Sequence, residues 1–154
     1  MKKCIALFLC LCLVVLIPTP ANACAQSNEG NVIYYQETDL GNGLTVIDEV
    51  TELPQARTTY GKTANRTATF KDGDTVIAVI VFQATFHYDG TTVSVASKSV
   101  IQTDTYDGWS YKQTSFTSSG GTVTLNARLT KLLIFNNAFT MTLSCDKNGN
   151  ISYT

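Results

Sequence analysis

The chain has 154 residues, of which 23 are Thr, 10 are Ser and one is His, and its formal net charge is −1. A single His excludes a two-His zinc motif, and the near-neutral charge gives no electrostatic footprint for nucleic acid. Apolar residues make up 44% of the chain, which excludes wholesale disorder and fits one domain with one core.

The first 23 residues have the three-part order of a cleavable signal peptide. Lys2 and Lys3 precede an unbroken apolar run at 5–17, and Ala21-Asn22-Ala23 supplies small residues around a cleavage point. The run is shorter than the ~20 residues that span a membrane as a helix. We therefore expect a helical signal over 1–23 and a secreted protein with no membrane span after its removal.

The cleavage point decides which cysteines remain. Cleavage after Ala23 leaves Cys24 first, whereas cleavage after Ala25 leaves Cys145 alone. A lipidated Cys24 would anchor the protein, but the preceding residues lack the larger aliphatic side chain expected three positions before such a Cys. An unlipidated Cys24 allows a Cys24–Cys145 disulfide, which could stabilise the fold by up to ~4–5 kcal/mol.

Charge divides the mature chain into two parts. Residues 26–56 contain six acids and no base, whereas residues 57–154 contain nine bases and six acids. We interpret 24–56 as an acidic hairpin or extension lying against a sandwich domain at 57–154. The alternative is an acidic strand offered to a partner, whose affinity would fall as salt screens exposed charges.

Alternation of apolar and polar residues with period two recurs along the mature chain and predicts strands. One clear unit has Val76, Ala78, Ile80, Phe82, Ala84, Phe86 and Tyr88 on one face. Hairpin turns are expected at Gly41-Asn42, Asp72-Gly73 and Asp89-Gly90. A two-residue turn at the last position would pair Phe86 with Val93. Seven or eight such strands predict an all-β antiparallel sandwich, immunoglobulin-like or jelly-roll-like.

Four short segments are rich in turn residues: Thr85-Phe86-His87-Tyr88-Asp89-Gly90, Gly108-Trp109, Ser119-Gly120-Gly121-Thr122 and 142–152. On these segments the stretch 57–154 resembles an uncharacterised family of small exported β-rich proteins of Gram-positive gut bacteria. The resemblance implies export and a sandwich-like fold, and it implies no activity. In that family a second Cys often follows the Tyr-x-Gly turn, in place to pair with the Cys near the C-terminus. Val95 stands there in this chain, so the resemblance supplies no local partner for Cys145.

The sequence offers little catalytic chemistry. His87 lies near Thr85, Thr92 and Asp89, but a hairpin surface lacks the water-excluded pocket and oxyanion donors that catalysis needs. The stretch 146–150 has oxygen side chains at alternate positions but no bidentate Glu after them, so we interpret it as a turn rather than a calcium loop. We expect no catalytic residues, no metal and no cofactor.

Aromatic residues are the first candidates for ligand binding. Tyr106, Trp109 and Tyr111 lie close together, and Trp109 and Tyr111 share a face if this stretch is a strand. An exposed set would stack on sugar rings. The alternative is that Trp109, the one Trp of the chain, lies in the core.

Leu132, Leu133, Ile134 and Phe135 form an apolar run just before Asn136-Asn137. Either another segment covers this run, or it is an exposed tip that contacts a partner protein or a membrane.

We therefore expect a secreted, non-enzymatic binding module for an extracellular glycan or protein. The second hypothesis is a self-associating surface protein or an effector that acts on other cells.

Overall fold

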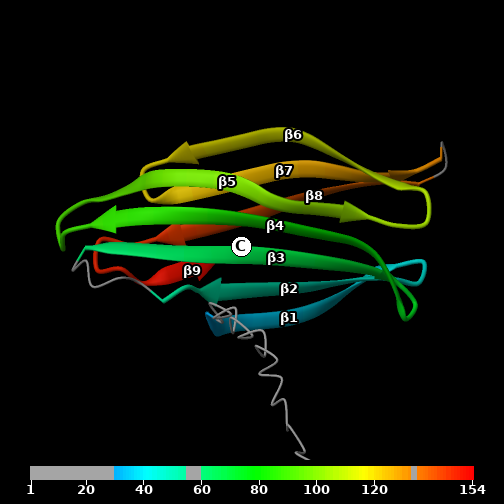
Figure 1. Ribbon diagram of the computed structural model, residues 1–154, viewed down its shortest axis with the longest axis horizontal. Helices are drawn as coiled ribbons and strands as arrows, with labels where there is room; N and C mark the ends of the chain where they lie inside the picture. Colours follow the sequence, from blue (N-terminus) through cyan, green and yellow to red (C-terminus); the bar gives the residue numbers. More distant parts are fainter. Residues whose placement is uncertain (1–29, 55–59, 133–134) are drawn as a thin grey trace, which may run out of the picture.

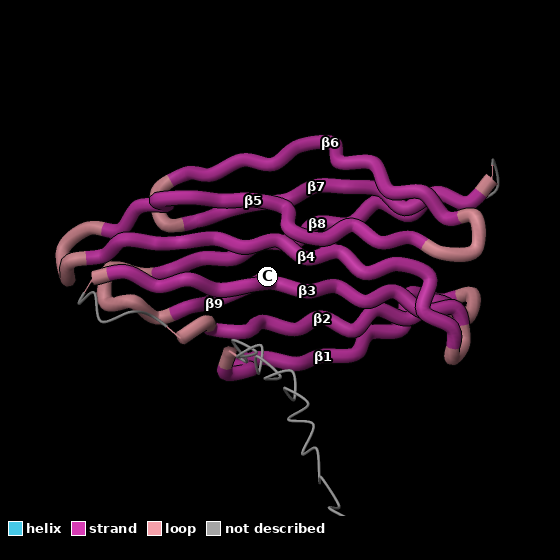
Figure 2. Tube along the Cα trace, in the orientation of Figure 1, coloured by secondary structure: helices cyan, strands magenta, loops and turns pink. Residues whose placement is uncertain are grey.

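The computed structural model describes residues 30–54, 60–132 and 135–154, and these form two antiparallel sheets with no helix among them (Figures 1 and 2). The first sheet consists of β1 (Asn31–Gly41), β2 (Leu44–Glu52), β3 (Gly61–Asp72), β4 (Thr75–Tyr88) and β5 (Val93–Thr105). The second consists of β6 (Trp109–Ser119), β7 (Thr122–Lys131), β8 (Phe135–Cys145) and β9 (Ile151–Tyr153). No described helix is long and apolar enough to cross a membrane, and the expected signal peptide lies outside the described residues.

Each sheet is a meander, in which strands that follow one another in the sequence are hydrogen-bonded neighbours. The all-β antiparallel prediction is confirmed. The immunoglobulin-like or jelly-roll-like connectivity is not found, because both require Greek-key crossovers and neither sheet contains one among the described strands. A short turn brings two strands that are consecutive in the sequence side by side in the sheet. A series of short turns therefore produces a meander rather than a Greek key.

The two sheets share one core, in the manner of a sandwich. Their inner faces contribute the fully buried side chains, which include Val50, Ile80, Phe82 and Phe86 from the first sheet and Val123, Leu125, Leu129, Met141 and Leu143 from the second. The period-two prediction is therefore confirmed for the long strands. Alternate Thr and Ser residues of β7 and β8 pair across the opposite face of the second sheet, as Thr124 does with Thr142.

The acidic N-terminal hairpin is an integral edge of the first sheet. β2 pairs with β3 from Leu44–Asp72 to Glu52–Ala64, so β1 and β2 extend the sheet rather than stand apart from it. The tight turn uses Asn42 and Gly43, with φ of 55° and 79°, one position after the expected pair. Positive φ at both central positions fits the twist of a hairpin.

The β4–β5 hairpin differs from its predicted register. Phe86 pairs with Val95 and His87 with Ser94, so the connection is longer than a two-residue turn. The reason is the carboxylate of Asp89, which accepts hydrogen bonds from the amides of Thr91 and Thr92 and from the Thr92 hydroxyl. This local capping orders a four-residue loop. The shift of two residues keeps Phe86 and Val95 on the inner face.

Three of the turn-rich segments meet at one end of the molecule. The Gly90 amide donates to Lys147 O at 2.8 Å, and the Cys145 amide donates to Gly121 O at 2.8 Å. A Cβ on Gly149 would lie 2.5 Å from the Tyr88 ring. The Asp146 carboxylate accepts from the Asn148 and Asn150 amides and from the Asn150 side chain. These segments therefore lock adjacent turns together, which agrees with the interpretation of 146–150 as a turn.

Candidate functional site

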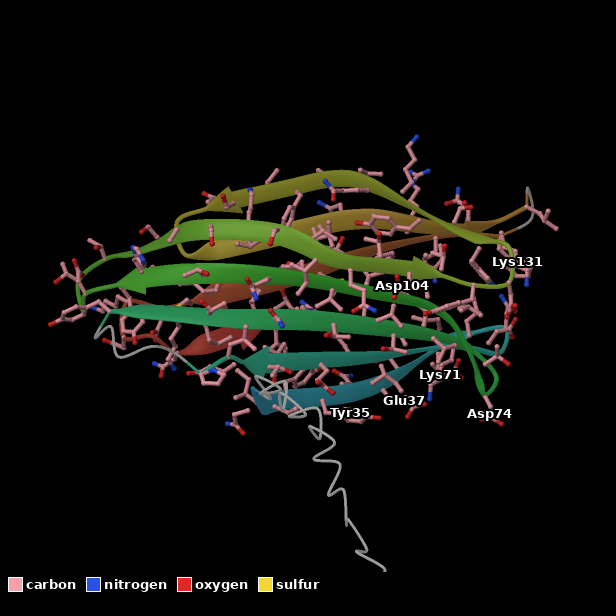
Figure 3. All side chains as sticks on the ribbon, in the orientation of Figure 1. Tyr35, Glu37, Lys71, Asp74, Asp104 and Lys131 are labelled. Carbon is pink, nitrogen blue, oxygen red and sulfur yellow. The ribbon has the colours of Figure 1, made fainter. Side chains whose placement is uncertain are left out.

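The structure brings Trp109, from the predicted aromatic set, and Leu132 and Phe135, from the predicted apolar run, to one depression. This depression lies at the end of the sandwich opposite the locked turns. It is lined by Asn42, Leu44, Asp72, Trp109, Lys131, Leu132 and Phe135. Trp109 begins β6, Lys131 ends β7 and Phe135 begins β8, so the depression lies where the second sheet meets the β1–β2 and β3–β4 turns. Lys131 and Asp74 mark this end in Figure 3.

Trp109 is part of the core rather than an exposed platform. Its side chain is 5% exposed, and the Phe135 ring lies 5.9 Å away between centroids. The Lys131 ammonium lies 5.7 Å from the centre of the indole ring, within cation–π range. The indole nitrogen is buried and has no hydrogen-bond partner among the described residues. The core alternative for Trp109 is the arrangement found.

The three aromatic residues do not form one surface. Trp109 and Tyr111 share a face as expected, but it is the inner face, because Tyr111 pairs with the core residue Leu129. Burial raises the pKa of the Tyr111 hydroxyl. Tyr106 is exposed and lies in the connection between β5 and β6, where the chain passes from the first sheet to the second. That corner is a tight turn with φ of 54° at Asp107 and 78° at Gly108.

The apolar tip is exposed where the structure describes it. Leu132 is 79% exposed and Phe135 is 42% exposed. Leu133 and Ile134 lie outside the described residues. Leu132 has a φ of 51°, which is unfavourable for a side chain with a Cβ, so the chain leaves β7 at a strained position. The depression beside Leu132 has a volume of about 110 Å³, less than the ~150 Å³ of a cavity that holds benzene.

The two outer faces of the sandwich carry opposite charge. The first sheet presents Glu37, Asp39, Glu49 and Asp104 on the face opposite the core, with Lys71 among them (Figure 3). The second sheet has Lys112 directly opposite Arg128 on its outer face. No acid occurs in residues 109–145, so these two cations have no carboxylate within their own sheet.

The remaining candidates lie elsewhere. Cys145 is buried and free, and burial raises the pKa of its thiol to about 11; the predicted partner Cys24 lies outside the described residues. His87 is exposed, and its side chain has no hydrogen bond to Asp89 among the described residues. Within the same ranges, no three His, Cys, Asp or Glu side chains converge as metal ligands do.

Sequence reasoning missed Arg66, which is 4% exposed. Its guanidinium bonds both oxygens of Asp48 and the main-chain oxygens of Thr142 and Thr154. The period-two pattern of the sequence was enough to predict its burial, because Arg66 lies two residues from Ala64 and two from Ala68, and all three face inward from β3.

No protein family, curated protein or solved structure matches the chain.

Proposed function

We propose that the protein is a secreted, non-enzymatic binding module that recognises another protein through the tip formed by Leu132 and Phe135. The observation that carries this proposal is the exposure of Leu132 at 79%, beside a depression that Trp109 helps to line. Exposed apolar side chains around a small pocket are typical of protein contacts. Lys131 and Asp72 at the rim would orient the partner.

The size of the depression favours a protein over a glycan. A volume of about 110 Å³ accepts one aliphatic side chain, whereas pockets for small ligands run to roughly 300–1,000 Å³. Stacking on a sugar also needs an open aromatic face, and Trp109 is buried. Glycan binding is therefore the weaker form of the proposal.

The test compares binding by the intact chain with binding by Leu132→Ser/Phe135→Ser. A screen against purified extracellular proteins and a glycan array identifies ligands, and a culture expressing the chain is fractionated into medium, wall and membrane. We expect recovery in the medium and a protein ligand whose affinity falls at least tenfold in the tip variant. Ile101→Ser is the matched control, because Ile101 is 51% exposed on another strand. Glycan binding alone, or equal losses in both variants, would refute the proposal.

A second candidate function is self-association as a surface protein. The opposite charges of the two outer faces favour it, since the acidic face of one copy complements the Lys112–Arg128 pair of another. Because the contact is head-to-tail, it would produce chains or rings of several copies rather than two-fold symmetric dimers. Sedimentation velocity at low and high salt tests this: assembly that weakens with salt supports it, and a monomer at both refutes it.

A further inference from the structure

The fourth strand of the second sheet covers only part of its neighbour. β9 pairs with β8 at Leu143–Cys145, and Thr142 and Thr154 exchange two further main-chain hydrogen bonds. Before Thr142, no described segment pairs with this edge of β8. Figure 2 shows β8 running on well past the short β9.

The alternation of an antiparallel ladder identifies which groups face this open edge. Successive residues direct their main-chain groups to opposite neighbours. Because Thr142 bonds toward β9, the amides and carbonyls of Thr140, Ala138 and Asn136 point the same way. Their register with β7 has no bulge, so this assignment holds along the strand. Three successive donor–acceptor pairs on this edge therefore have no main-chain partner within residues 30–54, 60–132 and 135–154.

An apolar groove with a volume of about 200 Å³ lies directly beside this edge, between the two sheets. Its lining includes Leu40, Val46, Ala68 and Phe70 from the first sheet and residues 137–141 of β8. The Phe70 and Phe139 rings lie 4.9 Å apart between centroids and join the two sides. Asp48, the one acid of the lining, is held by Arg66.

The side chains of β9 indicate which side chains of a strand in line with it would face the groove. Ile151 pairs with Cys145 and Tyr153 with Leu143, so both β9 side chains face inward, and the Tyr153 ring packs on Tyr34. A strand that extends this line would place its alternate side chains over Phe139, where the lining is apolar. Its other side chains would lie beside Thr140 and Ala138 on the outer face.

We infer that the groove beside residues 136–141 is a strand-acceptor site for an extended segment of a partner protein with apolar residues at alternate positions. The segment runs antiparallel to β8 in line with β9, and it completes the second sheet by main-chain hydrogen bonds. The open edge provides affinity for any extended backbone, and the groove selects the apolar alternation. This site is separate from the Leu132–Phe135 tip, so either can fail without the other.

The probe is the capped peptide Lys-Val-Thr-Val-Thr-Val-Lys, titrated into the isotope-labelled chain and followed by amide chemical shifts and hydrogen exchange. We expect shifts and slower exchange at the amides of Thr140 and Ala138. The Thr residues of the bound peptide would face outward and donate to β8. N-methylation at Thr should therefore abolish binding, and N-methylation at Val, which alters the far edge, should preserve it.

Two chain variants complete the test. Ala138→Pro removes an amide that faces the open edge, a position where a strand tolerates Pro, and it should weaken peptide binding at least tenfold. Should this variant unfold, Leu40→Asp puts a charge into the groove and should have the same effect, with Ile101→Asp as the matched control.

Equal affinities for the two methylated peptides would overturn the inference. So would protection of the Thr140 and Ala138 amides without peptide. Protection that depends on protein concentration would assign the groove to a second copy. Protection that is lost when residues 24–29 are deleted would assign it to the chain's own N-terminal segment.

Discussion

Arg66 and Asp48 form a two-point ion pair on the inner face of the first sheet, and the same guanidinium reaches across the core to Thr142 O and Thr154 O. Arg66 is 4% exposed. The planar fork of the guanidinium suits this double duty, because it presents five donors in fixed directions. A charge in the sandwich interior therefore joins β2 and β3 to the second sheet.

Removing Arg66 should be costly. Arg66→Met leaves the Asp48 carboxylate without its partner and frees two main-chain acceptors, so we expect the free energy of unfolding to fall by about 3 kcal/mol. Arg66→Met/Asp48→Leu should lose less than Arg66→Met alone, because apolar replacement of both charges is often neutral. Urea unfolding measures both values. A double variant less stable than the single one would contradict this account.

Trp109 should behave as a buried fluorophore. Its emission maximum should lie at short wavelength and shift to longer wavelength in denaturant, and acrylamide should quench it much less in the native protein. Trp109→Ala removes a core ring and should destabilise the fold by about 3–5 kcal/mol. Trp109→Phe keeps most of the packing and should cost less. Strong quenching in the native state would place the indole at the surface.

Cys145 should be nearly inert to alkylation. Burial raises the pKa of its thiol to about 11 from an ordinary value of 9.0, which lowers the thiolate fraction at pH 8 about 100-fold. Iodoacetamide labelling should therefore be at least 100-fold slower in the native protein than in urea. Because the folded pKa is raised, the thiol's contribution to stability is complete below pH 9 and is lost as the pH rises toward 11. Fast native labelling would contradict the buried position.

The locked turns should weaken in acid. Hydrogen bonds from Thr91 and Thr92 lower the pKa of Asp89, and hydrogen bonds from Asn150 lower the pKa of Asp146, both below the ordinary 3.8. Depressed carboxyl pKa values give stability that is present above pH 4 and lost as the pH falls through the folded values. The protection factors of the Asn148 and Asn150 amides, which correct for the intrinsic pH dependence of exchange, should therefore fall below pH 4. Asp146→Asn should remove that pH dependence but leave the one at Asp89.

The Lys112–Arg128 pair should be mildly unfavourable for the isolated chain. Like charges directly opposite on antiparallel strands repel, so Lys112→Glu should stabilise the fold by about 0.2–1 kcal/mol at low salt. The gain should shrink in 1 M salt, where screening is nearly complete. Lys112→Gln removes the repulsion from Arg128 without adding an attraction. The difference in stability between Lys112→Gln and Lys112→Glu therefore measures the attraction alone. A destabilised Lys112→Glu at low salt would mean that the two side chains do not face each other.

Much of the fold follows from local pattern. Alternation in β4 correctly placed Ile80, Phe82 and Phe86 inside, because a strand sends successive side chains to opposite faces. Turn chemistry located the hairpins but missed the β4–β5 register, since the Asp89 side chain competes with the two-residue turn. The sequence pattern also did not decide whether Trp109 lies in the core or on the surface, because either face of a short aromatic stretch can pack inward.

The sequence by itself determined the elements: strands with a Thr-rich wet side, their turns, and a charge asymmetry between the first and second parts of the chain. Only the tertiary structure decided what these elements meet. It set the change of sheet at Asp107-Gly108, the burial of Arg66, the approach of Leu132 and Phe135 to Trp109, and the open edge of β8. Period and turn preference act over a few residues, whereas these four outcomes depend on how two distant sheets share one core.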